Sequence, residues 1–313
     1  MSTIAELERK IDKMDGAIPI DSIDFGFKNS SDYLAEKYGP TQQTIHRIEG
    51  SVPLNIEQIT TISPHLHPVI TKFLNGPWVQ EETGHERIAG EFMRRIGVEP
   101  LLPEKEVVSL KFKIGGISSV IPSIRRAQTK LVFGRHASHE RLTATVYRRL
   151  FSELKADGEV GFVETAGPRI LQQEGRHLDF SRTVTEMMDA QMSPAERIFS
   201  RVLNRLTYEV VGVGNDGHRA QLGRVAALLT GGDMTVFSRP VEQISQELFN
   251  DELDDQLIIR AVRHYSRFAP RVEAAVQSIL GKTHDAEFVT KSLERCFVAA
   301  RAEKAKVISS KKQ

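Results

Sequence analysis

The chain has 313 residues, 40% hydrophobic and 27% charged, which is globular composition with room for one large domain or two ordinary ones. Its 42 basic residues nearly balance 41 acidic ones, which argues against a general nucleic-acid binder. The single cysteine, Cys296, excludes an internal disulfide and a zinc site built on several thiolates. No apolar run approaches the roughly 20 residues that cross a bilayer, and the charged amino end lacks a signal-peptide core. We therefore expect a cytoplasmic protein without a membrane span that binds no nucleic acid.

Helical patterns follow one another along the chain. Residues 1–30 are expected to form an amino-terminal arm, with a short helix ending near Gly16, and residues 31–313 a single domain. Gly39-Pro40 is expected to interrupt a helix over 31–49, and a helix over 162–190 is expected to be entered through Gly167-Pro168. Further helices are expected at residues 54–75 (bent or broken at two prolines), 78–96, 130–155, 194–208, 219–230, 252–281 and 285–305, while 104–127 is partly strand-like. This pattern predicts an all-α bundle.

Two of these helices contain the same Glu-x-x-His pattern, Glu82 with His85 and Glu174 with His177. On an α-helix, three residues rise about 4.5 Å and stay on one face, so both side chains of a pair can contact one ion. The alternative interpretation of each pair is a solvated surface contact.

A glutamate on an earlier helix accompanies each pair at a matched distance. Glu49 precedes Glu82 by 33 residues and Glu140 precedes Glu174 by 34. Two Glu-x-x-His helices, each paired with a helix that supplies one more Glu, are the ligand set of carboxylate-bridged di-iron bundles. The sequence therefore predicts a site for two iron ions (Fe²⁺), with manganese as a substitute.

The same residues lie in motifs that resemble those of the soluble acyl-[acyl-carrier-protein] desaturases of the ferritin-like superfamily. The motif Trp-x-x-Glu-Glu-x-x-His is intact over 78–85, and Thr143 follows Glu140 at the third position, as in the family. Residues 49–53 and 173–177 match their motifs in part, and the resemblance covers about residues 45–190. Gln173 stands where the family has an acid that orients a ligand, and Gly50 and Gly84 replace an acidic and a basic residue.

The resemblance implies a ferritin-like helical bundle with additional flanking helices, and an enzyme that uses O2 and external electrons to introduce a double bond into a fatty acyl chain carried on acyl-carrier protein. Thr143 would assist proton delivery. A ferredoxin-type electron donor and a second copy of the chain, in a homodimer, are the other implied partners. One iron would be held by Glu49, Glu82 and His85 and the other by Glu140, Glu174 and His177, with carboxylates bridging. An N-oxygenase or hydroxylase, or a non-catalytic iron-binding paralogue, remains the alternative.

An acyl substrate requires an elongated apolar tunnel beside the metals. We expect Leu142, Val146 and Leu178 to line it, and basic residues at its mouth to meet acidic acyl-carrier protein. The candidates for the mouth are Arg135, Arg148 and Arg149, which are otherwise a solvated helix face. Converged ligands without such a tunnel would favour a small-substrate oxygenase or a di-iron protein that has lost its substrate.

Several other residues carry weaker signals. His136 is expected near a helix start and partly exposed, with metal ligation as the alternative. Trp78 is either a core aromatic or part of an electron route. Capping or solvent exposure is expected for His65 and His67, burial as a small apolar residue for Cys296, and an interhelical loop rather than a dinucleotide site for Gly212, Gly214 and Gly217.

Overall fold

The computed structural model describes residues 3–100, 116, 119–207, 225, 229 and 235–249. Every regular element in these residues is helical, which confirms the all-α prediction for this part of the chain. The elements are α1 (Ile4–Ile11), the 3-10 turn η1 (Ile20–Ser22), α2 (Ser31–Glu49), α3 (Val52–Ile62), α4 (Pro68–Phe73), the π turn η2 (Leu74–Trp78), α5 (Val79–Arg95), α7 (Pro122–Ala156), α8 (Val160–Gln191), α9 (Pro194–Thr207) and α11 (Thr235–Phe249).

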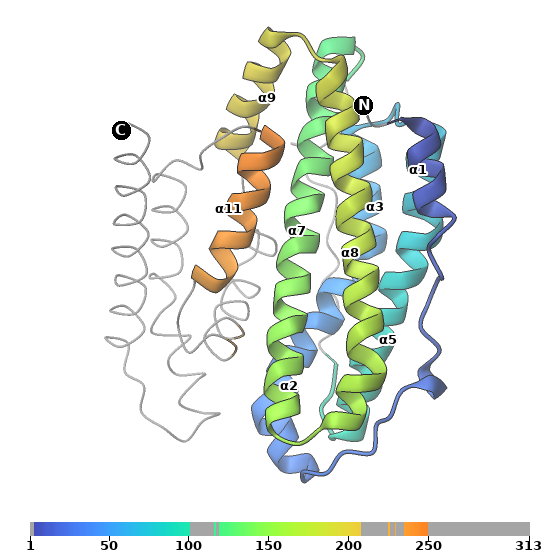
Figure 1. The fold of residues 1–313 in the computed structure, drawn as a ribbon, viewed down its shortest axis with the longest axis vertical. Coiled ribbons are helices and arrows are strands. Elements are labelled where there is room, and N and C mark those ends of the chain that lie inside the picture. Colours follow the sequence, from blue (N-terminus) through green and yellow to red (C-terminus); the bar gives the residue numbers. More distant parts are fainter. Residues whose placement is uncertain are drawn as a thin grey trace.

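The two longest helices, α7 and α8, form a hairpin and lie side by side over most of their length (Figure 1). Gly158 turns the chain between them with a φ of 89°, a left-handed conformation that favours glycine. Helix α2 packs against α5, while α9 and α11 pack against α7. The four helices α2, α5, α7 and α8 carry all six predicted metal ligands.

Two apolar cores lie at different levels along these helices. We call them the Tyr147 core and the Trp78 core. The Tyr147 core includes Ile45, Ile88, Tyr147 and Ile170. The Trp78 core includes Val52, Trp78, Phe133 and Phe180. Each predicted ligand lies in sequence between a member of one core and a member of the other, so the polar residues form a layer between two apolar ones.

Two expectations about prolines are wrong: Gly39-Pro40 does not interrupt a helix, and Gly167-Pro168 is not a helix entry. Helix α2 continues through Pro40, and α8 begins at Val160 and continues through Pro168. A proline inside a helix costs about 3 kcal/mol, which the packing of each helix against its neighbour offsets. At α8, Gly167 lets the helix approach α7 closely, since a Cβ there would lie 3.3 Å from the Phe151 ring.

Other boundaries also differ from the prediction. Helix α7 begins at Pro122, eight residues earlier than expected, and the sequence did not predict α11. Helix α11 contains Pro240, and its apolar residues Ile244 and Leu248 pack beside Leu131 of α7. Of the helix expected over 219–230, Val225 and Leu229 are described, both helical and buried. The predicted helices 252–281 and 285–305, most of the strand-like segment 104–127, the glycine motif at 212–217 and Cys296 lie outside the described residues.

Candidate metal centre

The six predicted ligands converge in the interior of the helical bundle. Glu49 ends α2, Glu82 and His85 lie on α5, Glu140 lies on α7, and Glu174 and His177 lie on α8; all six are buried. They form two groups of four, and the potential ligand atoms of each group lie within 4.8 Å of one another. One group is Glu49, Glu82, His85 and Glu174; the other is Glu82, Glu140, Glu174 and His177.

Glu82 and Glu174 belong to both groups, so their carboxylates lie between the two candidate metal positions. The Nδ1 atom of His85 is 3.2 Å from a carboxylate oxygen of each. On the opposite side, His177 Nδ1 is 3.0 Å from Glu82 Oε1 and 3.7 Å from Glu140 Oε2. Both imidazoles therefore direct Nδ1 into the carboxylate cluster.

Burial of several carboxylates in one small volume shifts their proton affinities. Burial and then repulsion from Glu82 raise the pKa of both Glu49 and Glu174 well above the usual range. Burial opposes protonation of His85, but the carboxylates of Glu174 and Glu82 outweigh it and raise the pKa of His85 to about 10. Without a metal ion, protons on these groups compensate the negative charge of the site.

The hydrogen bonding of this cluster tests whether metal ions fit it. Three buried atoms of the cluster lack a hydrogen-bond partner among the described residues. They are both carboxylate oxygens of Glu174 and the Nδ1 atom of His177. An unsatisfied buried polar group costs about 1–3 kcal/mol, and more when charged. Divalent cations bound by carboxylate oxygens and one imidazole each would satisfy these atoms, and that donor set suits iron or manganese.

The residue before each Glu-x-x-His pair contacts the histidine of the other pair. Glu81, on α5, accepts a hydrogen bond from His177 Nε2 at 2.7 Å. Gln173, on α8, accepts one through Oε1 from His85 Nε2 at 2.9 Å. The sequence pattern had singled out Gln173 by its difference from an acid, but Glu81 was missed. The signal was its position, directly before a ligand glutamate as Gln173 is.

A short segment of the amino-terminal arm holds both of these outer residues. Gln173 Nε2 donates to the Gly16 carbonyl at 2.7 Å, which fixes the amide with Oε1 toward His85. The Asp15 backbone N–H and the Arg176 guanidinium both donate to Glu81 Oε1, at 3.2 and 3.0 Å. The arm therefore takes part in positioning the imidazoles.

Tyr147 is a further residue of the site that the sequence pattern did not indicate. Its buried hydroxyl donates to Glu49 Oε1 at 3.0 Å. It lies two helical turns after Glu140, on the same face of α7. Burial and the nearby Glu49 raise the pKa of Tyr147 well above its ordinary value, so the hydroxyl remains a donor.

The expectation that His136 is partly exposed near a helix start is wrong. Because α7 begins at Pro122, His136 lies in the helix interior and is buried. Its Nδ1 lies 2.8 Å from Ser181 Oγ, and its Nε2 lies 3.2 Å from Glu140 Oε1 without a hydrogen bond. Burial lowers the pKa of His136, which favours a neutral ring beside the cluster.

The remaining predicted residues lie farther from the carboxylates or at the surface. Thr143 is half-buried on α7, one turn after Glu140, and its part in proton delivery stays a prediction. Trp78 is a core aromatic whose ring also lies 4.6 Å from that of His136. As expected, His67 caps α4 through a hydrogen bond from the Val69 N–H, and His65 is exposed.

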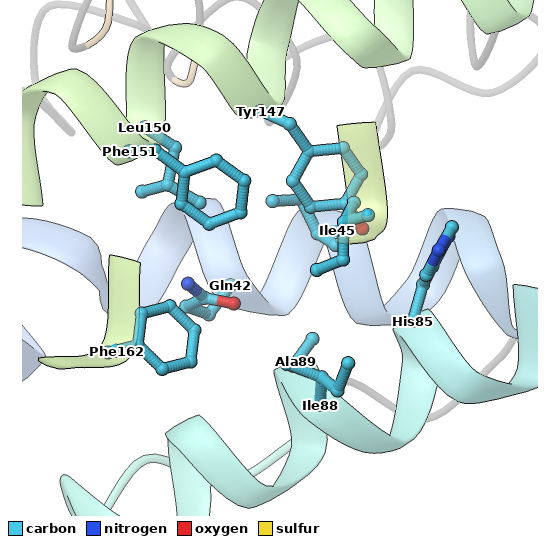
Figure 2. A pocket seen from close by; sticks show the side chains of 10 residues that line it. Gln42, Ile45, His85, Ile88, Ala89, Tyr147, Leu150, Phe151 and Phe162 are labelled. Carbon is cyan, nitrogen blue, oxygen red and sulfur yellow. The ribbon is translucent and has the colours of Figure 1, made fainter. Parts of the chain in front are cut away.

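A small apolar cavity adjoins His85. Its volume is about 10 Å³, close to the minimum that accepts one water molecule. Figure 2 shows His85 and Tyr147 toward one end and Phe151 and Phe162 toward the other. A cavity of this size does not hold an acyl chain.

The residues expected to line an acyl tunnel do not share one environment. Leu142 and Val146 pack against the Tyr147 core, which borders the cavity, whereas Leu178 packs with α11. Arg148 and Arg149 are exposed, and Arg135 is half-buried, all on α7.

No helix among the described residues is sufficiently long and apolar to cross a membrane. Searches of family models, curated proteins and solved structures with this chain found no match.

Proposed function

We propose that this protein is an O2-dependent oxidoreductase with a carboxylate-bridged pair of iron ions. The observation that supports it best is the convergence of two four-residue donor groups that share Glu82 and Glu174. Bound iron would supply the redox chemistry that reduces O2 and oxidises an organic substrate. The protein would supply ligand geometry and a dry interior, because apolar cores lie on both sides of the polar layer.

Within this class, the desaturase-like motifs of the sequence support an acyl chain on acyl-carrier protein as the first candidate substrate, although the cavity beside His85 is too small to hold such a chain. Desaturation removes two hydrogens from adjacent methylenes. With O2, two electrons and two protons, it yields the alkene and two water molecules. A ferredoxin-type donor would supply the electrons, Thr143 would assist proton delivery, and the enzyme would act as a cytoplasmic homodimer.

The size of the cavity favours a second candidate, N-oxygenation or hydroxylation of a small substrate. The cavity beside His85 has a volume of about 10 Å³. An acyl substrate would have to open it along the Tyr147 core, against which Leu142 and Val146 already pack. A small molecule would need less rearrangement of these side chains.

One experiment tests the class and separates the two candidates. The metal-free protein is loaded anaerobically with Fe²⁺, reduced, mixed with acyl-acyl-carrier proteins of several chain lengths and exposed to O2. Oxygen uptake and the mass of each chain are then measured. Loss of two hydrogens supports desaturation, whereas O2 uptake with unchanged acyl chains supports an O2-reactive iron centre and argues against the acyl substrate. Absence of both iron binding and O2 uptake would overturn the proposal.

Glu174→Ala is the inactive reference in this experiment, because Glu174 belongs to both donor groups. Glu164→Ala is the matched control on the same helix, since Glu164 is exposed. Activity lost in both variants would show that the assay reports damage to α8 rather than loss of ligands.

A further inference from the structure

The two imidazoles of the cluster form hydrogen bonds to different chemical groups through Nε2, the nitrogen that is not directed into the carboxylate cluster. His177 Nε2 donates to the Glu81 carboxylate at 2.7 Å, whereas His85 Nε2 donates to the Gln173 amide oxygen at 2.9 Å. A hydrogen bond to a carboxylate is charge-assisted and roughly twice as strong as one to a neutral acceptor. It also makes the imidazole more basic, and therefore a stronger ligand through its other nitrogen.

The ion pair of Glu81 with Arg176 does not remove this difference. Arg176 and the Asp15 N–H bind Oε1 of Glu81, while His177 is bound by Oε2. The carboxylate therefore keeps one oxygen for the imidazole. Gln173 brings no charge to His85, because its acceptor is an amide oxygen fixed by the bond from Nε2 to Gly16.

A second contact acts in the same direction. The Tyr147 hydroxyl donates to Glu49 Oε1 at 3.0 Å, which draws electron density from a carboxylate that belongs only to the His85 group. Glu140 is the corresponding carboxylate of the His177 group. The nearest His136 nitrogen lies 3.2 Å from it but forms no hydrogen bond. The residues on the His85 side are therefore expected to be the weaker metal ligands.

We propose that the two metal positions are unequal, and that Glu81 and Gln173 are the positioning residues that make them so. The position at His177 binds a divalent metal more tightly than the position at His85. The proposal rests on the dinuclear centre proposed above. Changes in the groups that hold metal-binding histidines alter affinity by about 10–100-fold, which sets the expected ratio between the positions. The metal at His85, beside the cavity, is then the one that exchanges more readily.

The test is a titration of the metal-free, full-length protein with Mn²⁺, in which the electron paramagnetic resonance signal of free Mn²⁺ measures binding. Wild type is expected to show one tight and one weaker site, with dissociation constants at least about 10-fold apart. His85→Ala should keep the tight site, and His177→Ala should keep the weak one. Circular dichroism checks that each variant is folded.

Exchange of the two supporting groups gives the decisive variant. In the double variant Glu81→Gln/Gln173→Glu, the charged acceptor moves from His177 to His85. Addition of His85→Ala should now leave the weaker site, and addition of His177→Ala the tighter one. A merely structural role of Glu81 and Gln173 would weaken both sites without reversing their order.

The possible failures are distinguishable. Two sites of equal affinity in wild type, or an order that the exchange leaves unchanged, would overturn this inference and leave the dinuclear centre intact. No Mn²⁺ binding by the folded wild-type protein, together with no binding of Fe²⁺, would overturn the proposed function itself.

Discussion

The surroundings of His85 and of His177 differ although both histidines belong to the same short pattern. Around His85 the neighbours are a neutral amide, the ring of Tyr147 at 5.9 Å and a small apolar cavity (Figure 2). Around His177 are the Glu81 carboxylate, with its partner Arg176, and the ring of Phe73 at 6.1 Å. Phe73 is itself stacked on Phe180 at 3.8 Å.

This difference suits the His85 side and the His177 side of the candidate centre to separate roles. The charged and closely packed His177 side suits retention of a metal ion. The His85 side borders a small cavity, so a small molecule would approach there. The two Glu-x-x-His pairs thus have the same sequence pattern but different surroundings.

The largest expected effect comes from a residue that serves both sides. Glu174→Ala removes a carboxylate shared by the two donor groups, so iron content should fall from about two ions per chain to near zero. His177→Ala should have the smaller effect of leaving one ion. Metal analysis after anaerobic loading and desalting measures both, with Glu164→Ala on the exposed face of α8 as the control. Equal iron content in Glu174→Ala and wild type would contradict the shared role.

A second effect is the pH dependence of the metal-free protein. The pKa of His85 is raised to about 10 from the ordinary 6.5. A raised folded-state pKa adds stability that is complete below pH 6.5 and is lost as the pH rises toward 10. The metal-free protein should therefore lose at least about 1.4 kcal/mol of unfolding free energy between pH 7 and 9, the equivalent of one pKa unit.

Urea unfolding at both pH values measures this loss, with Mn²⁺-loaded protein as the comparison. A ligated imidazole carries no proton on its ligand nitrogen, so the loaded protein should lose less stability over the same range. Equal losses in the two forms would show that His85 is not the source of the pH dependence.

The sequence predicted which residues converge in the candidate site better than it predicted their surroundings. The Glu-x-x-His pairs and the matched positions of Glu49 and Glu140 depend on helical periodicity, which is local and readable. Gln173 was noticed because it differs from an expected acid. Glu81 and Tyr147 act across helices, and their contacts with His177 and Glu49 depend on packing that no local pattern encodes.

The prediction of several helix boundaries was wrong for a related reason. Pro40 and Pro168 are local helix breakers, yet both lie inside helices because tertiary packing outweighs the local cost. The early start of α7 at Pro122 is the boundary that matters most for the site. Because of it, His136 lies in the helix interior beside Glu140 and not near the expected helix start.

The smallest expected effect is a change in stability when the glycine within each Glu-x-x-His pair is replaced by alanine. Gly84 precedes His85, and Gly175 lies between Glu174 and Arg176. A Cβ at Gly84 would lie 3.2 Å from Ala17 Cα and from Ile18 N, whereas a Cβ at Gly175 meets nothing within 4 Å. Gly84→Ala should therefore destabilise the protein by about 1–3 kcal/mol through overpacking against the arm. Gly175→Ala should stabilise it by roughly 0.5–1 kcal/mol, because alanine is the better helix former.

Urea unfolding of the metal-free variants measures both changes, and each variant serves as the control for the other. Gly84→Ala should also weaken Mn²⁺ binding at the His85 position, because displacement of the arm moves the Gly16 carbonyl that orients Gln173. Gly175→Ala should leave both positions unchanged. If Gly84→Ala were as well tolerated as Gly175→Ala, the arm would not be packed against α5 closely enough to position Gln173, and the difference between the two sides would need another cause.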